Sequence, residues 1–178
     1  MRPDPRRMFR TLRRRAMPEA PDLDALRSQV GGLESRLVAR LDPHELPFAE
    51  FRVYSQFGED GIIQFLIQRV PIDRDVFVEF GVGDYREANT RFLLEHDNWR
   101  GLVIDGGTAH VEFLRSSELL WRHELEARSA WIDRENIDSL LRESGVEGDI
   151  GLLSVDLDGV DYWVFEAIEA VSPRILVV

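Results

Sequence analysis

The chain has 178 residues, with 22 basic and 33 acidic side chains, and its formal net charge is −11. Its content of 44% apolar and 10% aromatic residues is enough for a folded core of about one domain, which excludes a wholly disordered chain. No run of about 18 apolar residues occurs, so we expect no membrane span. The absence of cysteine excludes disulfides and thiolate metal sites.

The charge is unevenly distributed along the chain. Residues 1–16 contain seven arginines and one acidic residue, and the remainder carries a net charge of −17. An acidic body is poorly suited to bind nucleic acid, because phosphate contacts supply most of that affinity. We therefore expect no nucleic-acid partner. We interpret residues 1–21 as a basic, disordered arm, whose charge also suits an anionic surface.

Residues 22–47 are predicted to form an amphipathic helix followed by a linker. The pattern rests on five apolar residues spaced alternately by three and four, as in a short coiled-coil seam: Leu23, Leu26, Val30, Leu33 and Leu37. Gly31 and Gly32 interrupt this pattern at a cost of about 1 kcal/mol each. Two interpretations remain open: the helix packs on its own domain, or it forms a homodimer through residues 23–37.

From residue 48 onward, helical and strand patterns alternate. Helices are predicted over residues 58–70, 89–96, 111–121, 134–144 and 162–170. Strands are predicted over residues 76–80, 101–105, 126–132, 150–158 and 174–178. Each strand is a nearly continuous apolar run, which is typical of a parallel sheet covered on both faces. Residues 48–178 are therefore predicted to be an α/β domain, a three-layer Rossmann-like parallel sheet with helices on both faces.

In such a sheet, ligands bind at the carboxyl ends of the strands. Gly81 and Gly83 follow the first strand and allow a sharp turn with close approach to a ligand. A dinucleotide fingerprint would have a third glycine where this chain has Arg86, and Asp84 would lie near the pyrophosphate. Glu79 and Asp84 instead suit a cationic ligand without phosphate, such as S-adenosylmethionine. A purely structural tight turn is the alternative.

Acidic residues also follow the later strands. Asp105 lies 22 residues after Gly83, where a carboxylate can accept a ribose diol, although an Asp-Gly turn would explain it too. Asp133 either faces an adenine amine or caps the next helix. Asp156 and Asp158, two apart at a predicted strand end, are expected to point the same way and can serve as a base, a cofactor contact or a divalent-cation site. The scattered histidines provide no ligand pair, so no metal site is predicted.

Four segments together resemble FkbM-like S-adenosylmethionine-dependent methyltransferases, especially bacterial members found among polysaccharide genes: residues 55–62, 77–90, 98–106 and 152–168. The resemblance covers about residues 50–178. It implies a class I methyltransferase fold in which Glu79, Gly81 and Gly83 form the cofactor turn. It further implies that Asp105 holds the ribose, and that Asp156 and Asp158 face the reaction site.

The resemblance also implies that the segment around Gln56 and Glu59 closes over the cofactor, with a simple helix N-terminus as an equal alternative. Asn89 is a further candidate cofactor contact. The expected function is O-methylation of a hydroxyl on a small-molecule or glycan acceptor, such as a sugar or polysaccharide precursor, by a cytoplasmic enzyme. Domains of this family continue through two more strands, so we expect a C-terminally truncated domain whose activity is open. The alternative is a non-catalytic Rossmann-like interaction module.

Overall fold

The computed structural model describes residues 23–178, so the predicted basic arm lies outside the described residues. Its centre is a five-stranded sheet in which every pairing is parallel and the strand order is β3-β2-β1-β4-β5. The strands are β1 (Val76–Phe80), β2 (Arg100–Asp105), β3 (Leu125–Ser129), β4 (Gly148–Val155) and β5 (Val171–Val177). The predicted α/β, Rossmann-like fold class is confirmed.

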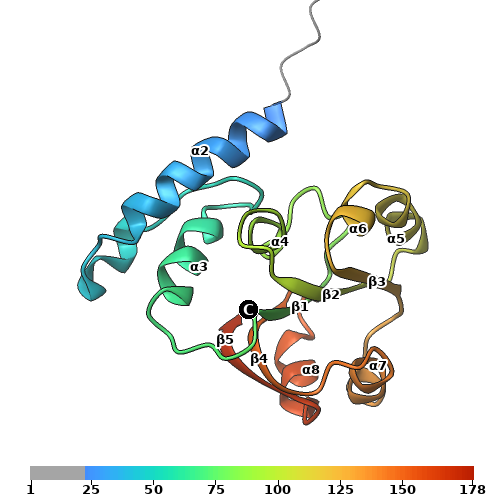
Figure 1. Cartoon of the computed structure of the whole chain (residues 1–178). Coiled ribbons are helices and arrows are strands. Elements are labelled where there is room, and N and C mark those ends of the chain that lie inside the picture. The colour runs from blue at the N-terminus through green and yellow to red at the C-terminus, as the bar shows by residue number, and fades with distance from the viewer. Residues whose placement is uncertain (1–22) are drawn as a thin grey trace, which may run out of the picture.

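Helices cover both faces of the sheet (Figure 1). One face packs against α3 (Glu59–Ile67), α4 (Arg91–His96), α5 (Thr108–Arg115) and α6 (Leu119–Arg122). The other face packs against α7 (Ile137–Glu143) and α8 (Asp161–Ala167). The N-terminal helix α2 (Leu23–Val38) lies outside the first helical layer and leads into a short 3₁₀ helix, η1 (Pro43–Phe48).

Strand β1 illustrates why its sequence is continuously apolar. The side chain of Phe77 is fully buried in the core on the α3–α6 side, whereas Val78 and Phe80 are buried on the α7–α8 side. Full burial of such side chains contributes about 1.5–3 kcal/mol each, so both faces of the strand stabilise the sheet. Glu79 is the polar exception in this strand, and its partners lie in the loop that follows β1.

The helix α2 packs on its own domain. The contact uses the face opposite to the five apolar residues of the predicted seam, which we call the leucine stripe: Leu23, Leu26, Val30, Leu33 and Leu37. Gly31, Ser35 and Val38 are buried on this face. The Ser35 hydroxyl donates a 2.7 Å hydrogen bond to the side-chain oxygen of Gln64, whose amide in turn donates to the Asp97 carboxylate. Gln64 lies in α3 and Asp97 directly follows α4, so these hydrogen bonds fix α2 against two helices of the domain.

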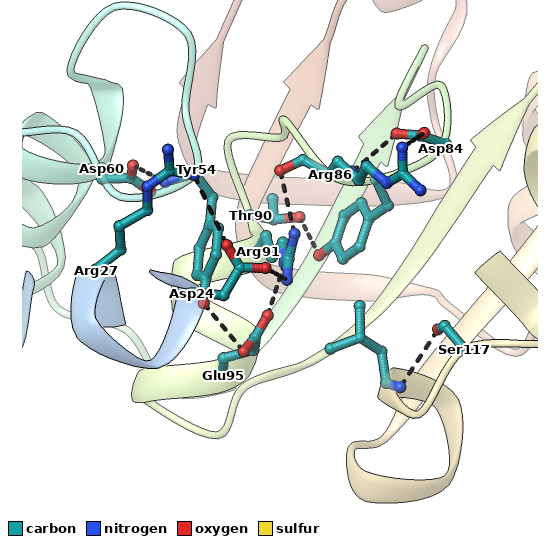
Figure 2. A network of polar contacts seen from close by, with 12 residues as sticks. Asp24, Arg27, Tyr54, Asp60, Asp84, Arg86, Thr90, Arg91, Glu95 and Ser117 are labelled. Carbon is teal, nitrogen blue, oxygen red and sulfur yellow. Dashed lines mark hydrogen bonds and ion pairs between the residues drawn. The ribbon is translucent and has the colours of Figure 1, made fainter. Parts of the chain in front are cut away.

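A second attachment of α2 centres on Arg91 at the start of α4. Figure 2 shows its guanidinium group between the carboxylates of Asp24 and Glu95. Its Nε atom lies 2.6 Å from Glu95 Oε1, and its guanidinium carbon lies 4.0 Å from the centre of the Tyr54 ring. The Tyr54 hydroxyl donates to the same Glu95 carboxylate. Burial, followed by the charge of Glu95, raises the pKa of Tyr54, which therefore stays protonated as this donor.

Several predicted boundaries are wrong. The helix predicted over 134–144 begins only at Ile137, the helix predicted over 162–170 ends at Ala167, and the strand predicted over 174–178 begins at Val171. The strand predicted over 126–132 ends at Ser129, where its pairing partner β2 also ends, at Asp105. The strand predicted over 150–158 ends at Val155, where its pairing partner β1 also ends, at Phe80, and Asp158 and the following glycine then take positive φ angles of 50° and 100°. The helix predicted over 111–121 is two helices, α5 and α6, separated by a turn at residues 116–118.

Candidate functional site

Two adjoining cavities lie at the carboxyl ends of the strands, beside the β1–β4 pair where the strand order reverses direction along the sheet. Their volumes are about 730 and 270 Å³, and Gly81 and Asp156 line both. Doubly wound sheets bind ligands at this kind of reversal point, because the loops on its two sides diverge. The described residues therefore place the predicted glycine turn and the predicted strand-four acids at one site.

The two glycines of the turn serve different purposes. Gly81 has a φ of 75°, and a Cβ atom there would lie 1.7 Å from the backbone oxygen of Asp156. Gly83 has a φ of 53°, but a Cβ atom there would meet nothing within 4 Å. Close packing of β1 against β4 thus requires glycine at 81, whereas Gly83 leaves the turn open toward the larger cavity.

Asp105 connects the turns that follow β1 and β2. Its Oδ2 atom accepts a 2.8 Å hydrogen bond from the N–H of Gly83, and its Oδ1 atom accepts a 2.7 Å bond from the N–H of Gly107. The ring of His110 lies 3.6 Å from Oδ1. The carboxylate lines the smaller cavity. Since each oxygen has a second lone pair, Asp105 can still accept hydroxyl donors from a ligand.

Glu79 holds the loop between β1 and α4. Its carboxylate accepts hydrogen bonds from the N–H groups of Asn89 and Thr90 and from the Thr90 hydroxyl. Burial raises the pKa of Glu79, and these donors oppose the shift. Its side chain lines the larger cavity, where its Oε2 atom already accepts two of these bonds and only Oε1 keeps a free lone pair. Asn89 lines the same cavity and donates from its side-chain amide to the Ser154 hydroxyl.

The predicted contacts Gln56, Glu59 and Asp84 also line the larger cavity. Glu59 opens α3 and accepts a hydrogen bond from the N–H of Phe57, so the helix N-terminus interpretation describes its local structure. Asp84 accepts a bond from the N–H of Arg86, whose guanidinium lies 3.5 Å away. Residues at the start of α3 and after β1 thus line one cavity.

Asp156 and Asp158 do not point the same way by strand alternation, because both follow the end of β4. Asp156 lines both cavities, whereas Asp158 lines only the smaller one. Burial, followed by the charges of Asp158 and Asp161, raises the pKa of Asp156. Asp161, which the sequence analysis missed, accepts hydrogen bonds from the N–H groups of Leu157 and Gly159 and shapes this loop.

Asp133 is the predicted site residue that lines neither cavity. Its Oδ1 atom accepts hydrogen bonds from the N–H groups of Glu135 and Asn136, both at 2.9 Å, and so holds the turn that leads into α7, whose N-cap residue is Asn136. The neighbouring Trp131 was missed as a site residue: it lines the smaller cavity and is 82% exposed. Its position just after a strand was the available signal, but the predicted strand extended too far to reveal it.

Within residues 23–178, no group of three or more histidine, aspartate or glutamate side chains is arranged to hold a metal ion. None of the helices in this described part is both long and apolar enough to cross a membrane. No protein-family model matches the chain, and a search of curated proteins finds no match.

Proposed function

We propose that the chain is an S-adenosylmethionine-dependent methyltransferase of the FkbM-like kind that methylates a hydroxyl oxygen of a sugar or polysaccharide precursor. One observation carries the proposal: Asp105, at the end of β2, hydrogen-bonds the glycine turn that follows β1, beside two joined cavities. A glycine turn followed by a strand-end carboxylate is an arrangement that accommodates a nucleoside with a ribose diol.

The residues around the two cavities fit this cofactor. In the smaller cavity, Trp131 and Ile132 offer apolar surface to a planar base, and Asp105 offers carboxylate oxygens to ribose hydroxyls. In the larger cavity, Glu59 and Asp84 provide negative charge for a cationic ammonium and sulfonium. S-adenosylmethionine, when bound, supplies an electrophilic methyl group on its sulfonium.

Asp156 is the best candidate for the general base. It lies where the two cavities meet, so it can reach a hydroxyl of an acceptor in the larger cavity. Its raised pKa makes its carboxylate a better proton acceptor than an ordinary aspartate. Asp158 adds negative charge beside it and is the second candidate. The rest of the protein's contribution is positioning of the acceptor oxygen.

The test is calorimetric titration of the 178-residue chain with S-adenosylhomocysteine, the product form of the cofactor. We expect saturable binding that Asp105→Asn weakens about tenfold or more, because a ribose hydroxyl would then meet an amide donor. Asp133→Asn is the matched control, since that carboxylate lines neither cavity, and it should bind as the wild type does. Thermal unfolding of both variants verifies that each is folded.

Absence of binding by the folded wild type, or wild-type affinity in Asp105→Asn, would overturn the proposal. A parallel titration with NAD tests the nicotinamide alternative. The charge of Asp84 in the larger cavity argues against it, and Arg86 stands where the dinucleotide fingerprint has its third glycine. The interaction-module alternative is favoured by one separate observation, the exposed apolar stripe of α2. It predicts self-association without binding of S-adenosylhomocysteine.

A further inference from the structure

The helix α2 presents two different faces. Its inner face is buried on the domain. Its outer face carries the five residues of the leucine stripe, each between 49% and 61% exposed: Leu23, Leu26, Val30, Leu33 and Leu37. Figure 1 shows that the outer side of α2 is turned away from α3 and α4. A continuous row of half-exposed apolar side chains is unusual on a free surface and marks an interaction site.

The glycine pair explains why this face stays outward. A Cβ atom on Gly31 would lie 2.3 Å from Val53 Cγ2, and one on Gly32 would lie 3.1 Å from the His96 ring. These glycines therefore lie on the inner face, where they allow α2 to approach the domain closely. Rotating the helix to bury its leucines would remove this contact and the ion pair of Asp24 with Arg91.

We propose that a second copy of this chain covers the stripe, and that the two α2 helices pair in antiparallel orientation about a two-fold axis. The alternating spacing of three and four is the spacing of a and d positions in a coiled coil. In the antiparallel register, Leu26 packs against Leu37 of the partner subunit, and Val30 packs against Leu33 of the partner subunit. The symmetry repeats each contact, which gives four apolar layers and a closed dimer.

The charges beside the stripe favour this orientation. Arg27 and Glu34 lie on the same edge of the stripe, seven residues apart, at e positions. Antiparallel pairing brings each Arg27 beside Glu34 of the partner subunit, so two ion pairs form by symmetry. Glu34 makes no ion pair among the described residues, and the one ion pair of Arg27 there is with Asp24, at 3.7 Å. A parallel pair would set Glu34 against Gln29 of the partner subunit, without an ion pair.

The experiment is sedimentation analysis of the full 178-residue chain over a range of concentrations. We expect a concentration-dependent species of twice the 20.6 kDa chain mass. Leu33→Glu should abolish it without unfolding the domain, because this side chain is 59% exposed. Trp121→Glu is the matched control: this residue is 71% exposed on α6, so the variant should still form the dimer. Circular dichroism verifies that both variants remain folded.

Charge reversal tests the orientation. Arg27→Glu and Glu34→Arg alone should each weaken the dimer about tenfold, because like charges then meet across the two-fold axis. The double variant Arg27→Glu/Glu34→Arg should restore wild-type association. A wild type that stays monomeric at every concentration, or a dimer that survives Leu33→Glu, would overturn the proposal. Failure of the double variant to recover would overturn the antiparallel register. None of these outcomes depends on cofactor binding.

Discussion

Asp105 and Gly83 are joined by a 2.8 Å hydrogen bond that runs from the glycine N–H to the aspartate Oδ2 atom. The other oxygen of the same carboxylate accepts the N–H of Gly107, in the turn after β2. One side chain thereby ties together the turns that follow two neighbouring strands. The position of the glycine turn relative to the smaller cavity is thus set by the protein before any ligand binds, which is how a binding site is preorganised.

The two glycines of this turn should respond differently to alanine. Gly81→Ala should destabilise the domain by about 3 kcal/mol or more, because its Cβ atom would overlap the backbone oxygen of Asp156. Gly83→Ala should cost only about 1–2 kcal/mol, the price of a left-handed residue in open space. Urea unfolding of the two variants measures both values. Equal losses would contradict the distinct roles of the two positions.

Much of the fold could be predicted because its strands are buried on both faces. The runs at 76–80 and 101–105 are apolar at nearly every position, so β1 and β2 were predicted within one residue. Boundaries failed where a tertiary contact or a backbone angle ended the element. Asp158 has a φ of 50° in a loop that is held by hydrogen bonds from the N–H groups on either side of it to the Asp161 carboxylate. No local sequence pattern predicts such bonds.

The candidate site was predictable in position but less so in detail. The carboxyl ends of parallel strands lie at the same edge of a sheet, which is why Gly81, Asp105 and Asp156 could be placed together from the sequence. The sequence does not reveal which oxygens the protein itself occupies. Glu79 fits a cofactor contact by spacing, yet its oxygens bind the loop at Asn89 and Thr90.

Arg91 should contribute more to stability than an exposed arginine with a similar ion pair. Arg91→Ala should lower the free energy of unfolding by about 2–4 kcal/mol, because it leaves Glu95 and the Tyr54 ring without their cationic partner. Arg122→Ala is the matched control. Arg122 pairs with Glu118 at 2.7 Å on the surface, and its loss should cost less than about 1 kcal/mol. Chemical unfolding compares them; similar losses would contradict the prediction.

Asp60 should make stability depend on pH. Its Oδ2 atom accepts bonds from the N–H groups of residues 53–55, while its Oδ1 atom is buried without a partner among the described residues. Burial raises the pKa of Asp60 despite these donors. The folded state therefore binds this proton more tightly than the unfolded state. The contribution of this protonated carboxyl to the stability of the fold is fully present below the unfolded pKa of about 4, and it is lost as pH rises through the folded pKa.

Asp60→Asn removes that titration, so the stability of the variant relative to the wild type should increase as pH rises above about 4. Asp161→Asn provides a control of opposite sign. Hydrogen bonds from the N–H groups of Leu157 and Gly159 lower the pKa of Asp161. Relative to the wild type, that variant should lose stability as pH rises through the lowered folded pKa toward 4. Thermal unfolding of the wild type and both variants across this pH range measures these trends. The same trend in both variants would contradict the opposite pKa shifts of Asp60 and Asp161.

Gly31 and Gly32 offer a direct measurement of how α2 is attached. Alanine gains about 1 kcal/mol of helix propensity over glycine at either position. At Gly31 the new Cβ atom would overlap the buried Val53 Cγ2 atom. Gly31→Ala should therefore lower the free energy of unfolding by a net amount of about 1–2 kcal/mol. At Gly32 the new Cβ atom would meet the His96 ring at 3.1 Å, a tight contact but not an overlap, so Gly32→Ala should be neutral or stabilising by up to about 1 kcal/mol. Urea unfolding decides the sign of each change. Stabilisation by Gly31→Ala would mean that α2 does not press against Val53, and that its leucine stripe is not held outward.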